Sequence, residues 1–98
     1  MNHLVTIRPE AEADLLDAFH WYEQRRFGLG QSLLLSVEAT LTSIQEHPLL
    51  FPLVHGNVRR ALIRRFPFGV YYLVEGENVV VLAIFHASRD PRGWQTRS

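Results

Sequence analysis

The stretch FPFGVYYLVEGENVVVLAIFH, residues 66–86, decides the fold because it contains two strands and the turn that joins them. Residues 79–85 are apolar on both alternating faces, which is typical of a central strand covered on both sides. Residues 69–75 form a second strand-like run, and Gly76-Glu77-Asn78 has the composition of a hairpin turn. We therefore expect an antiparallel hairpin, with residues 79–86 near the centre of a sheet.

Two further strands are expected outside this hairpin. Residues 58–66 mix arginine with apolar residues, which suits an edge strand or a strand with one solvated face. Residues 3–8 alternate apolar and polar side chains and predict a first strand. Residues 47–57 contain two prolines and a glycine without a clear period, so we expect a loop there.

The segment between the first strand and this loop has the period of two helices. Pro9 suits the first position of a helix, and Gly28 and Pro48 mark where the two helices end. We expect the first helix to extend to about residue 27. Apolar residues recur every three or four positions at Ala11, Leu15, Ala18, Phe19 and Tyr22, and then at Leu33, Leu34, Val37, Leu41 and Ile44.

These patterns predict an α+β fold in which a two-helix hairpin packs on a three- to four-stranded antiparallel sheet, in the order β-α-α-β-β-β. A chain of 98 residues is expected to form a single domain, residues 1–98. The chain has no cysteine and no apolar run near the ~20 residues of a membrane span. We expect no membrane association and a cytoplasmic location.

Charge is divided unevenly between the two halves. Residues 1–46 carry seven acidic residues and three arginines, a net charge of −4, and residues 47–98 carry the reverse, +4. This asymmetry predicts a basic sheet face and tail opposite acidic helices. All ten basic residues are arginine. Either lysine is rare in this proteome, or planar guanidinium contacts with phosphate or carboxylate groups are favoured.

Motifs for common enzyme classes are absent from the sequence. It has no phosphate-binding glycine loop and no paired cysteines, and its five histidines lack the i, i+4 spacing of a helical metal site. We therefore expect neither a metal nor another cofactor. His86, which ends the central strand, is the exception, because Arg89 follows it closely. His86 either acts as a general acid or base on an RNA phosphate, or caps the strand by hydrogen bonds to residues 88–90.

The remaining residues of the C-terminal segment have structural and functional interpretations. Asp90 is expected to pair with Arg89 or Arg92. Trp94 either anchors the tail against the domain or stacks on a base. Tyr71 and Tyr72 should point to opposite faces of their strand, one into the core and the other into solvent.

The order of elements, together with five short motifs, resembles the RelE/ParE superfamily of type II toxins. The motifs are Glu-Ala-Asp-Leu at 12–15, Trp-Tyr-Glu at 21–23, Pro48, Phe-Pro-Phe-Gly-Val-Tyr-Tyr at 66–72, and His-Ala-Ser-Arg-Asp-Pro at 86–91. The resemblance covers nearly the whole chain. It implies two helices packed on an antiparallel sheet, and neutralisation by a cognate antitoxin protein in a toxin-antitoxin hetero-oligomer.

The superfamily has two branches, which imply different activities. RelE-like toxins cleave mRNA on the ribosome with basic residues and a terminal tyrosine or histidine. Arg60 and Arg89 match two of those cations, but Gly69 stands where a further arginine is expected, and Trp94 stands near the expected tyrosine. Tryptophan cannot transfer a proton, and losing a catalytic cation costs about 3 to 4 kcal/mol of barrier.

ParE-like toxins bind DNA gyrase without catalysis, and the His-x-x-Arg-Asp-Pro ending of this chain is closer to that branch. We therefore expect a ParE-like toxin that inhibits gyrase. The alternatives are a RelE-like mRNA endonuclease, in which Arg60, His86 and Arg89 carry the reaction, and a decayed toxin that only binds its antitoxin. Candidate residues for target binding are Arg59, Arg60, Arg64, Arg65, Arg89, Arg92 and Trp94.

Overall fold

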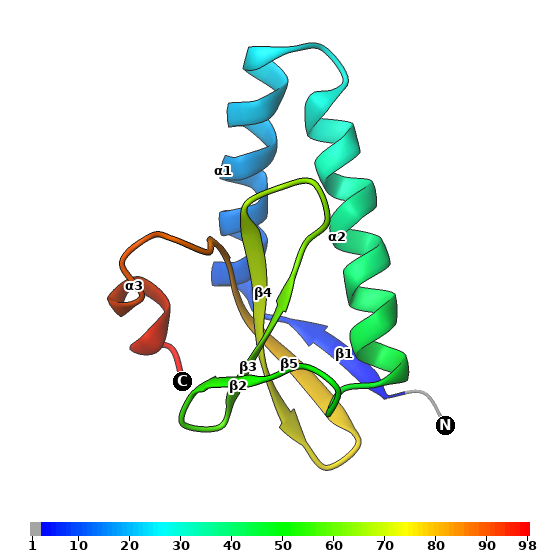
Figure 1. Ribbon diagram of the computed structural model, residues 1–98, viewed down its shortest axis with the longest axis vertical. Coiled ribbons are helices and arrows are strands. Elements are labelled where there is room, and N and C mark those ends of the chain that lie inside the picture. Colours follow the sequence, from blue (N-terminus) through cyan, green and yellow to red (C-terminus); the bar gives the residue numbers. More distant parts are fainter. Residues whose placement is uncertain (1–2) are drawn as a thin grey trace.

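The computed structural model describes residues 3–98, which form two long helices against a five-stranded sheet (Figure 1). The helices cover one face of the sheet, and a short C-terminal helix lies at the other. The elements in chain order are β1 (Leu4–Ile7), α1 (Pro9–Arg25), α2 (Leu29–Glu46), β2 (Leu53–His55), β3 (Val58–Leu62), β4 (Phe68–Glu75), β5 (Asn78–His86) and α3 (Arg92–Gln95).

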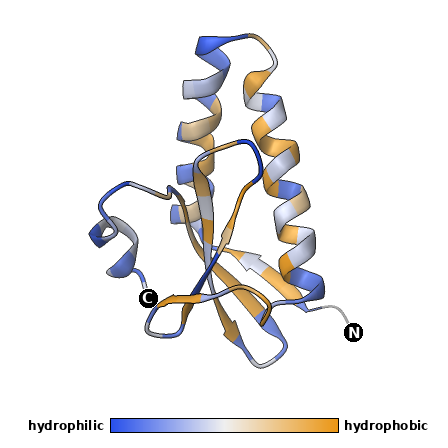
Figure 2. Cartoon of the chain, viewed as in Figure 1, coloured by the Kyte–Doolittle hydropathy of each residue, from blue (hydrophilic) through white to orange (hydrophobic). Residues whose placement is uncertain are grey.

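The helices form where the apolar period predicts them. Pro9 occupies the start of α1, where its missing N–H costs nothing, and Glu10 and Glu12 lie near the positive end of the helix dipole. The most deeply buried residues of both helices belong to the predicted stripes, among them Ala11 in α1 and Leu33 in α2. Figure 2 shows hydrophobic residues along the strands and hydrophilic residues in α3. The two-helix hairpin and the α+β class are confirmed.

The sheet has the order β1-β5-β4-β3-β2, so β5 is an inner strand between β1 and β4, and it is covered on both faces, as predicted. Two features differ from the expected sheet of three or four antiparallel strands. β1 runs parallel to β5, from which both helices and three strands separate it along the chain. A fifth strand, β2, forms within the predicted loop 47–57 and pairs with β3.

β3 ends at Leu62, four residues earlier than expected. The chain turns through residues 63–67, where Arg65 has a φ of 71° in the left-handed region. This turn lifts Arg64 and Arg65 out of the sheet.

The sheet buries apolar residues on both faces. The helix-side core contains Val70, Tyr72 and Val81, together with the helix stripes. The tail-side core comprises Val58, Tyr71, Leu82, Ala83 and Trp94.

Tyr71 and Tyr72 do point to opposite faces, but the expectation that one of them reaches solvent is wrong. Tyr71 is 2% exposed and Tyr72 is 0% exposed, because α3 covers the face that the long helices leave open. No helix in residues 3–98 has the length and apolar character that a membrane span requires.

Candidate functional site

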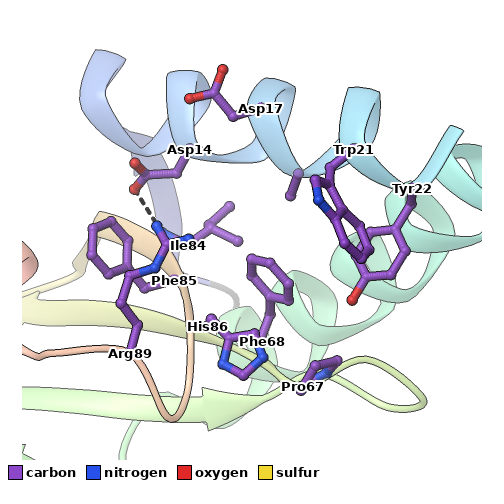
Figure 3. A pocket seen from close by; sticks show the side chains of 11 residues that line it. Asp14, Asp17, Trp21, Tyr22, Pro67, Phe68, Ile84, Phe85, His86 and Arg89 are labelled. Carbon is purple, nitrogen blue, oxygen red and sulfur yellow. Dashed lines mark hydrogen bonds between the residues drawn. The ribbon is translucent and has the colours of Figure 1, made fainter. Parts of the chain in front are cut away.

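A cavity of about 570 Å³ lies between α1 and the ends of β4 and β5. Its floor is largely aromatic, with Tyr22 and Phe68 in edge-to-face contact at 6.1 Å between ring centroids. Trp21, which is 51% exposed, stands at its outer side. Figure 3 shows the Asp14 carboxylate on α1 turned toward the strands, whereas the Asp17 carboxylate points away from His86 and Arg89.

His86 is held by the turn that follows it. Its Nδ1 accepts a hydrogen bond from the Ser88 backbone N–H at 3.2 Å and lies 2.8 Å from the Ser88 hydroxyl. Its ring also packs edge to face against the Phe68 ring, with 5.5 Å between the ring centroids. His86 therefore caps the end of its strand, which was the structural interpretation of this residue.

Arg89 and His86 line the same cavity, so the structure brings this pair of predicted residues together. The Arg89 guanidinium lies 5.6 Å from the centre of the Phe85 ring and makes no ion pair among residues 3–98. Asp14 and Asp17 also line this cavity, so it holds acidic as well as basic residues. The cavity is therefore mixed in charge rather than basic.

Asp14 is engaged by a residue that sequence reasoning missed. Arg97 Nη1 lies 2.6 Å from Asp14 Oδ2, and the same carboxylate oxygen accepts the Ile84 N–H at 3.1 Å. Arg97 also donates to the Leu82 carbonyl at 3.1 Å. These contacts fasten the C-terminal tail to both α1 and β5. No local pattern signals a pair that is separated by 83 residues.

Arg60 lies on the other face of the sheet from His86. Arg60 opposes Tyr71 in register, and a Cβ added at Gly69 would lie 2.9 Å from Arg60 Cγ. His86 instead opposes Phe68, which packs against the helix-side core. Because neighbouring residues of a strand point to opposite faces, Arg60 and His86 are separated by the sheet.

Arg60 nevertheless has one unusual feature, a buried Nε that has no hydrogen-bond partner among residues 3–98. Gly69 leaves the space that the Arg60 side chain fills. The departure from the RelE-like pattern at Gly69 thus has a structural role, since a larger residue there must displace Arg60.

Arg59 is used within the fold. Its guanidinium donates to the Phe51 carbonyl at 2.7 Å and to the Leu49 carbonyl at 3.3 Å, which ties the segment after α2 to β3. It opposes Tyr72 and so belongs to the helix side of the sheet. Of the two strand arginines, only Arg60 lies on the face that α3 covers.

Two of the remaining basic residues are exposed, and a third is paired. Arg64 and Arg65 are exposed and line a second hollow of about 510 Å³ beside α2. Arg92 is paired with Asp90, whose carboxylate Oδ2 lies 2.9 Å from Arg92 Nε. The hydrogen bonds from Arg92 lower the pKa of the exposed Asp90 carboxyl below its ordinary value.

Trp94 is a buried anchor. It is 4% exposed, and its ring stacks on Tyr71 at 4.3 Å between centroids. The structural interpretation of Trp94 therefore holds, and its ring is not presented at the surface. In the described part of the chain, no group of three or more histidine, aspartate or glutamate side chains is arranged to hold a metal ion.

An apolar groove lies on the other side of α1, beside the free edge of β1. The strand order places β1 at one end of the sheet, with β5 on one side only. Leu16 is 56% exposed there, and Leu4 at the start of β1 is 67% exposed. The groove, of about 610 Å³, is lined by Val5, Ile7, Glu12, Leu15, Leu16, Phe19 and Leu34.

Comparison with solved structures shows where this fold occurs. The structure of a chromosomal ParDE toxin-antitoxin system from P. aeruginosa superposes with a TM-score of 0.74 at 19% identity, over 86% of this chain and 95% of that one. The toxin-antitoxin complex RelBE2 from Mycobacterium tuberculosis gives a TM-score of 0.59 at 20% identity, over 88% and 99%. At these identities the likeness is one of fold.

The family to which the chain belongs is established by its amino-acid sequence. No curated protein sequence matches the chain. The profile of the ParE toxin of the type II toxin-antitoxin system parDE matches residues 5–91. That match includes both long helices and all but the first residue of the five-stranded sheet. The chain belongs to the ParE toxin family of type II toxin-antitoxin systems.

Proposed function

We propose that this ParE-family toxin acts in the cytoplasm by binding DNA gyrase, without cutting RNA, and that a cognate antitoxin neutralises it by covering the groove beside β1. Exposed arginines, Arg64, Arg65 and Arg89, supply the cations for an acidic surface of the target. Arg59, Arg92 and Arg97 are engaged in contacts within the chain.

The separation of Arg60 from His86 carries the proposal. A ribonuclease needs its cations and its proton donor around one phosphate, within hydrogen-bond reach of the reacting atoms. Here the sheet lies between Arg60 and His86, and two acidic residues also line the cavity of His86. A binding protein has no such requirement, because charges at the rim of its interface need only be opposite in sign to those on the partner.

The test is regulated expression in bacteria without antitoxin, followed by two separate measurements of DNA supercoiling and mRNA integrity. We expect growth arrest, relaxed plasmid DNA and intact mRNA. Purified toxin should inhibit supercoiling by purified gyrase. Absence of inhibition at micromolar toxin contradicts the gyrase target, and normal growth identifies a decayed toxin.

The variant His86→Ala separates the binder from the ribonuclease. We expect it to inhibit gyrase as the unaltered chain does, because His86 serves as a cap in the turn at residues 86–88. Replacing Arg64 and Arg65 together by alanine should weaken inhibition and reduce its salt dependence. Loss of mRNA cleavage in His86→Ala, after cleavage by the unaltered toxin in a translation extract, would favour the RelE-like mechanism instead.

The groove beside β1 suits an antitoxin segment for two reasons. The free edge of β1 offers backbone groups for an added strand, and exposed leucines such as Leu16 offer apolar contact area. An antitoxin strand followed by an amphipathic helix satisfies both. The resulting complex is a toxin-antitoxin hetero-oligomer.

The variant Leu16→Glu tests this surface. A charge placed in the groove should weaken antitoxin affinity by roughly tenfold or more, because it is desolvated on binding. Leu50→Glu is the matched control, since Leu50 is 73% exposed and lies outside the groove. Titration calorimetry with the antitoxin measures both. Equal affinities of the two variants contradict the assignment of the groove.

A further inference from the structure

The turn between α1 and α2 is built to be rigid. The Glu23 carboxylate accepts hydrogen bonds from the Gly28 and Gly30 N–H groups, both at 2.9 Å, and so caps the start of α2. Gly28 has a φ of 87°, which glycine adopts without strain. A Cβ at Gly30 would lie 2.7 Å from the Phe19 ring, so the helices approach each other closely there. The end of the helical hairpin therefore has one defined conformation.

This rigid turn holds an aromatic side chain in water. Phe27 is 95% exposed, more than any other large apolar residue in residues 3–98. It belongs to neither core, so it contributes nothing to folding by burial. Arg25 and Arg26 beside it are exposed, and the Arg25 guanidinium lies 4.0 Å from the Trp21 ring centre. We call Trp21, Arg25, Arg26 and Phe27 the hairpin tip.

The hairpin tip stands apart from the rest of the molecule. Figure 1 shows the turn at the end of the two helices farthest from β1 and β2. Neither tip arginine is in an ion pair among the described residues, and the nearby Glu23 is occupied by backbone amides. The tip is therefore a narrow cationic projection with an aromatic centre.

We propose that the hairpin tip inserts Phe27 into an apolar pocket rimmed by carboxylates on the protein that this toxin inhibits. Aromatic residues and arginine are the side chains that dominate binding energy at protein interfaces. Trp94, an aromatic residue expected to contact the target, is instead buried between α3 and the sheet, so Phe27 takes the role of the exposed anchor. The proposal rests on the proposed function only in that the toxin has a protein target.

The charge distribution favours a protein pocket over a nucleic acid. Cationic charge at the tip is confined to Arg25 and Arg26, whereas the exposed face of α1 below carries Asp17 and Glu12. A duplex that received Phe27 between two base steps would need cations along several phosphates on either side. A pocket with an acidic rim needs only the two arginines.

The tip is also separate from the groove assigned to the antitoxin. Phe19 is the residue of α1 nearest the turn that lines the groove, and α1 continues six residues beyond it to Arg25, about 9 Å at 1.5 Å per residue. Changes at the tip should therefore leave antitoxin binding intact.

The decisive variant is Phe27→Ala. It removes an exposed side chain, so the fold and the antitoxin affinity should be unchanged, while growth arrest is lost and affinity for gyrase falls roughly tenfold or more. Arg25→Ala with Arg26→Ala should reduce affinity and its salt dependence together. Leu50→Ala, an exposed apolar residue away from the tip, is the matched control and should retain full activity.

Glu23→Gln provides a second test without touching the contact residues. A carboxamide has one acceptor oxygen in place of two, so one of the hydrogen bonds to Gly28 and Gly30 is lost and the turn loosens. We expect weaker gyrase binding together with faster amide exchange at residues 26–30. Faster exchange with unchanged gyrase affinity contradicts the need for a rigid tip.

The outcomes separate this inference from the proposed function. If the unaltered toxin leaves gyrase active but Phe27→Ala still abolishes growth arrest, the gyrase target fails and the tip inference holds for another protein. Three results overturn the inference. The first is full growth arrest by Phe27→Ala, and the second is a loss of affinity for the antitoxin in this variant that equals its loss of affinity for gyrase. The third such result is an unaltered chain that does not arrest growth. If the unaltered toxin binds purified duplex DNA and Phe27→Ala does not, the proposal that Phe27 enters a pocket on a protein is overturned.

Discussion

At the scale of single residues, Tyr72 joins the sheet to the segment that follows α2. Its hydroxyl donates a hydrogen bond of 2.6 Å to the Pro48 carbonyl, and the residue is fully buried. Tyr72→Phe leaves that carbonyl without its partner, so the free energy of unfolding should fall by about 1 to 3 kcal/mol. Urea denaturation followed by circular dichroism measures the change. An unaltered midpoint would mean that water replaces the hydroxyl.

The same phenol predicts how stability depends on pH. Burial raises the pKa of Tyr72 to about 12, although the nearby Arg59 opposes the shift. Because the folded pKa lies above the ordinary value of 10.0, the stabilisation is complete below pH 10 and is lost as pH rises toward 12. Stability of Tyr72→Phe should decline less across this window. Burial also raises the pKa of Tyr22, which contributes with the same sign in both proteins.

Gly30 is the residue that allows the two long helices to meet. Gly30→Ala places a methyl group 2.8 Å from the Phe19 backbone carbonyl, which cannot move without shifting α1. We expect a loss of about 1 to 3 kcal/mol in the free energy of unfolding, as in other overpacked sites. Gly56→Ala serves as a comparison that has backbone strain without a steric clash. Open space surrounds Gly56, but its φ of 53° is strained for alanine. A thermal midpoint of Gly30→Ala at or above that of the unaltered protein contradicts the close approach.

Sequence reasoning succeeded at residues whose roles depend on near neighbours. The cap at His86 and the pair between Asp90 and Arg92 join residues two positions apart, so local chemistry predicts them. Arg59 and Arg97 were not assigned their roles, because their partners are backbone carbonyls and a carboxylate that only the tertiary fold brings near. A guanidinium can satisfy many partners, and its sequence position does not select one.

At the scale of elements, the C-terminal tail depends on the contact between Arg97 and Asp14. The exposed fractions of the two side chains are 20% and 13%, so water screens the pair only in part. Arg97→Ala should destabilise the tail by about 1 to 3 kcal/mol and speed amide exchange in α3. Arg92→Ala is the control, since its exposed pair with Asp90 contributes only about 0 to 1 kcal/mol. Equal exchange in the two variants would show that Trp94 alone holds α3.

The elements that were predicted are those with a long, regular apolar period. α1 and α2 each extend over more than four turns, and β5 is apolar on both faces. β2 and α3 have three and four residues, too few to establish a period. The parallel pairing of β1 joins residues 4–7 to residues 78–81, a long-range contact that residues 3–8 do not encode on their own.

At the scale of the whole molecule, the tail should unfold together with the domain. Trp21→Phe leaves Trp94 as the only tryptophan, and Trp94 contacts Tyr71 in the sheet. Because the tail is bonded to both α1 and β5, Trp94 fluorescence and helical circular dichroism should report one urea midpoint. An earlier fluorescence transition would identify the tail as a separate unit.

The parallel pairing of β1 with β5 also determines when the sheet can form. Residues 4–7 pair with residues 78–81, so β1 has no partner strand in the sheet until the ribosome has reached residue 78. At a usual 5 to 20 residues per second, a ribosome needs about 4 to 15 s to make the intervening segment. The pairing of β1 in the sheet therefore forms only after residues 78–81 have been synthesised, and a nascent chain that stops before residue 78 lacks it.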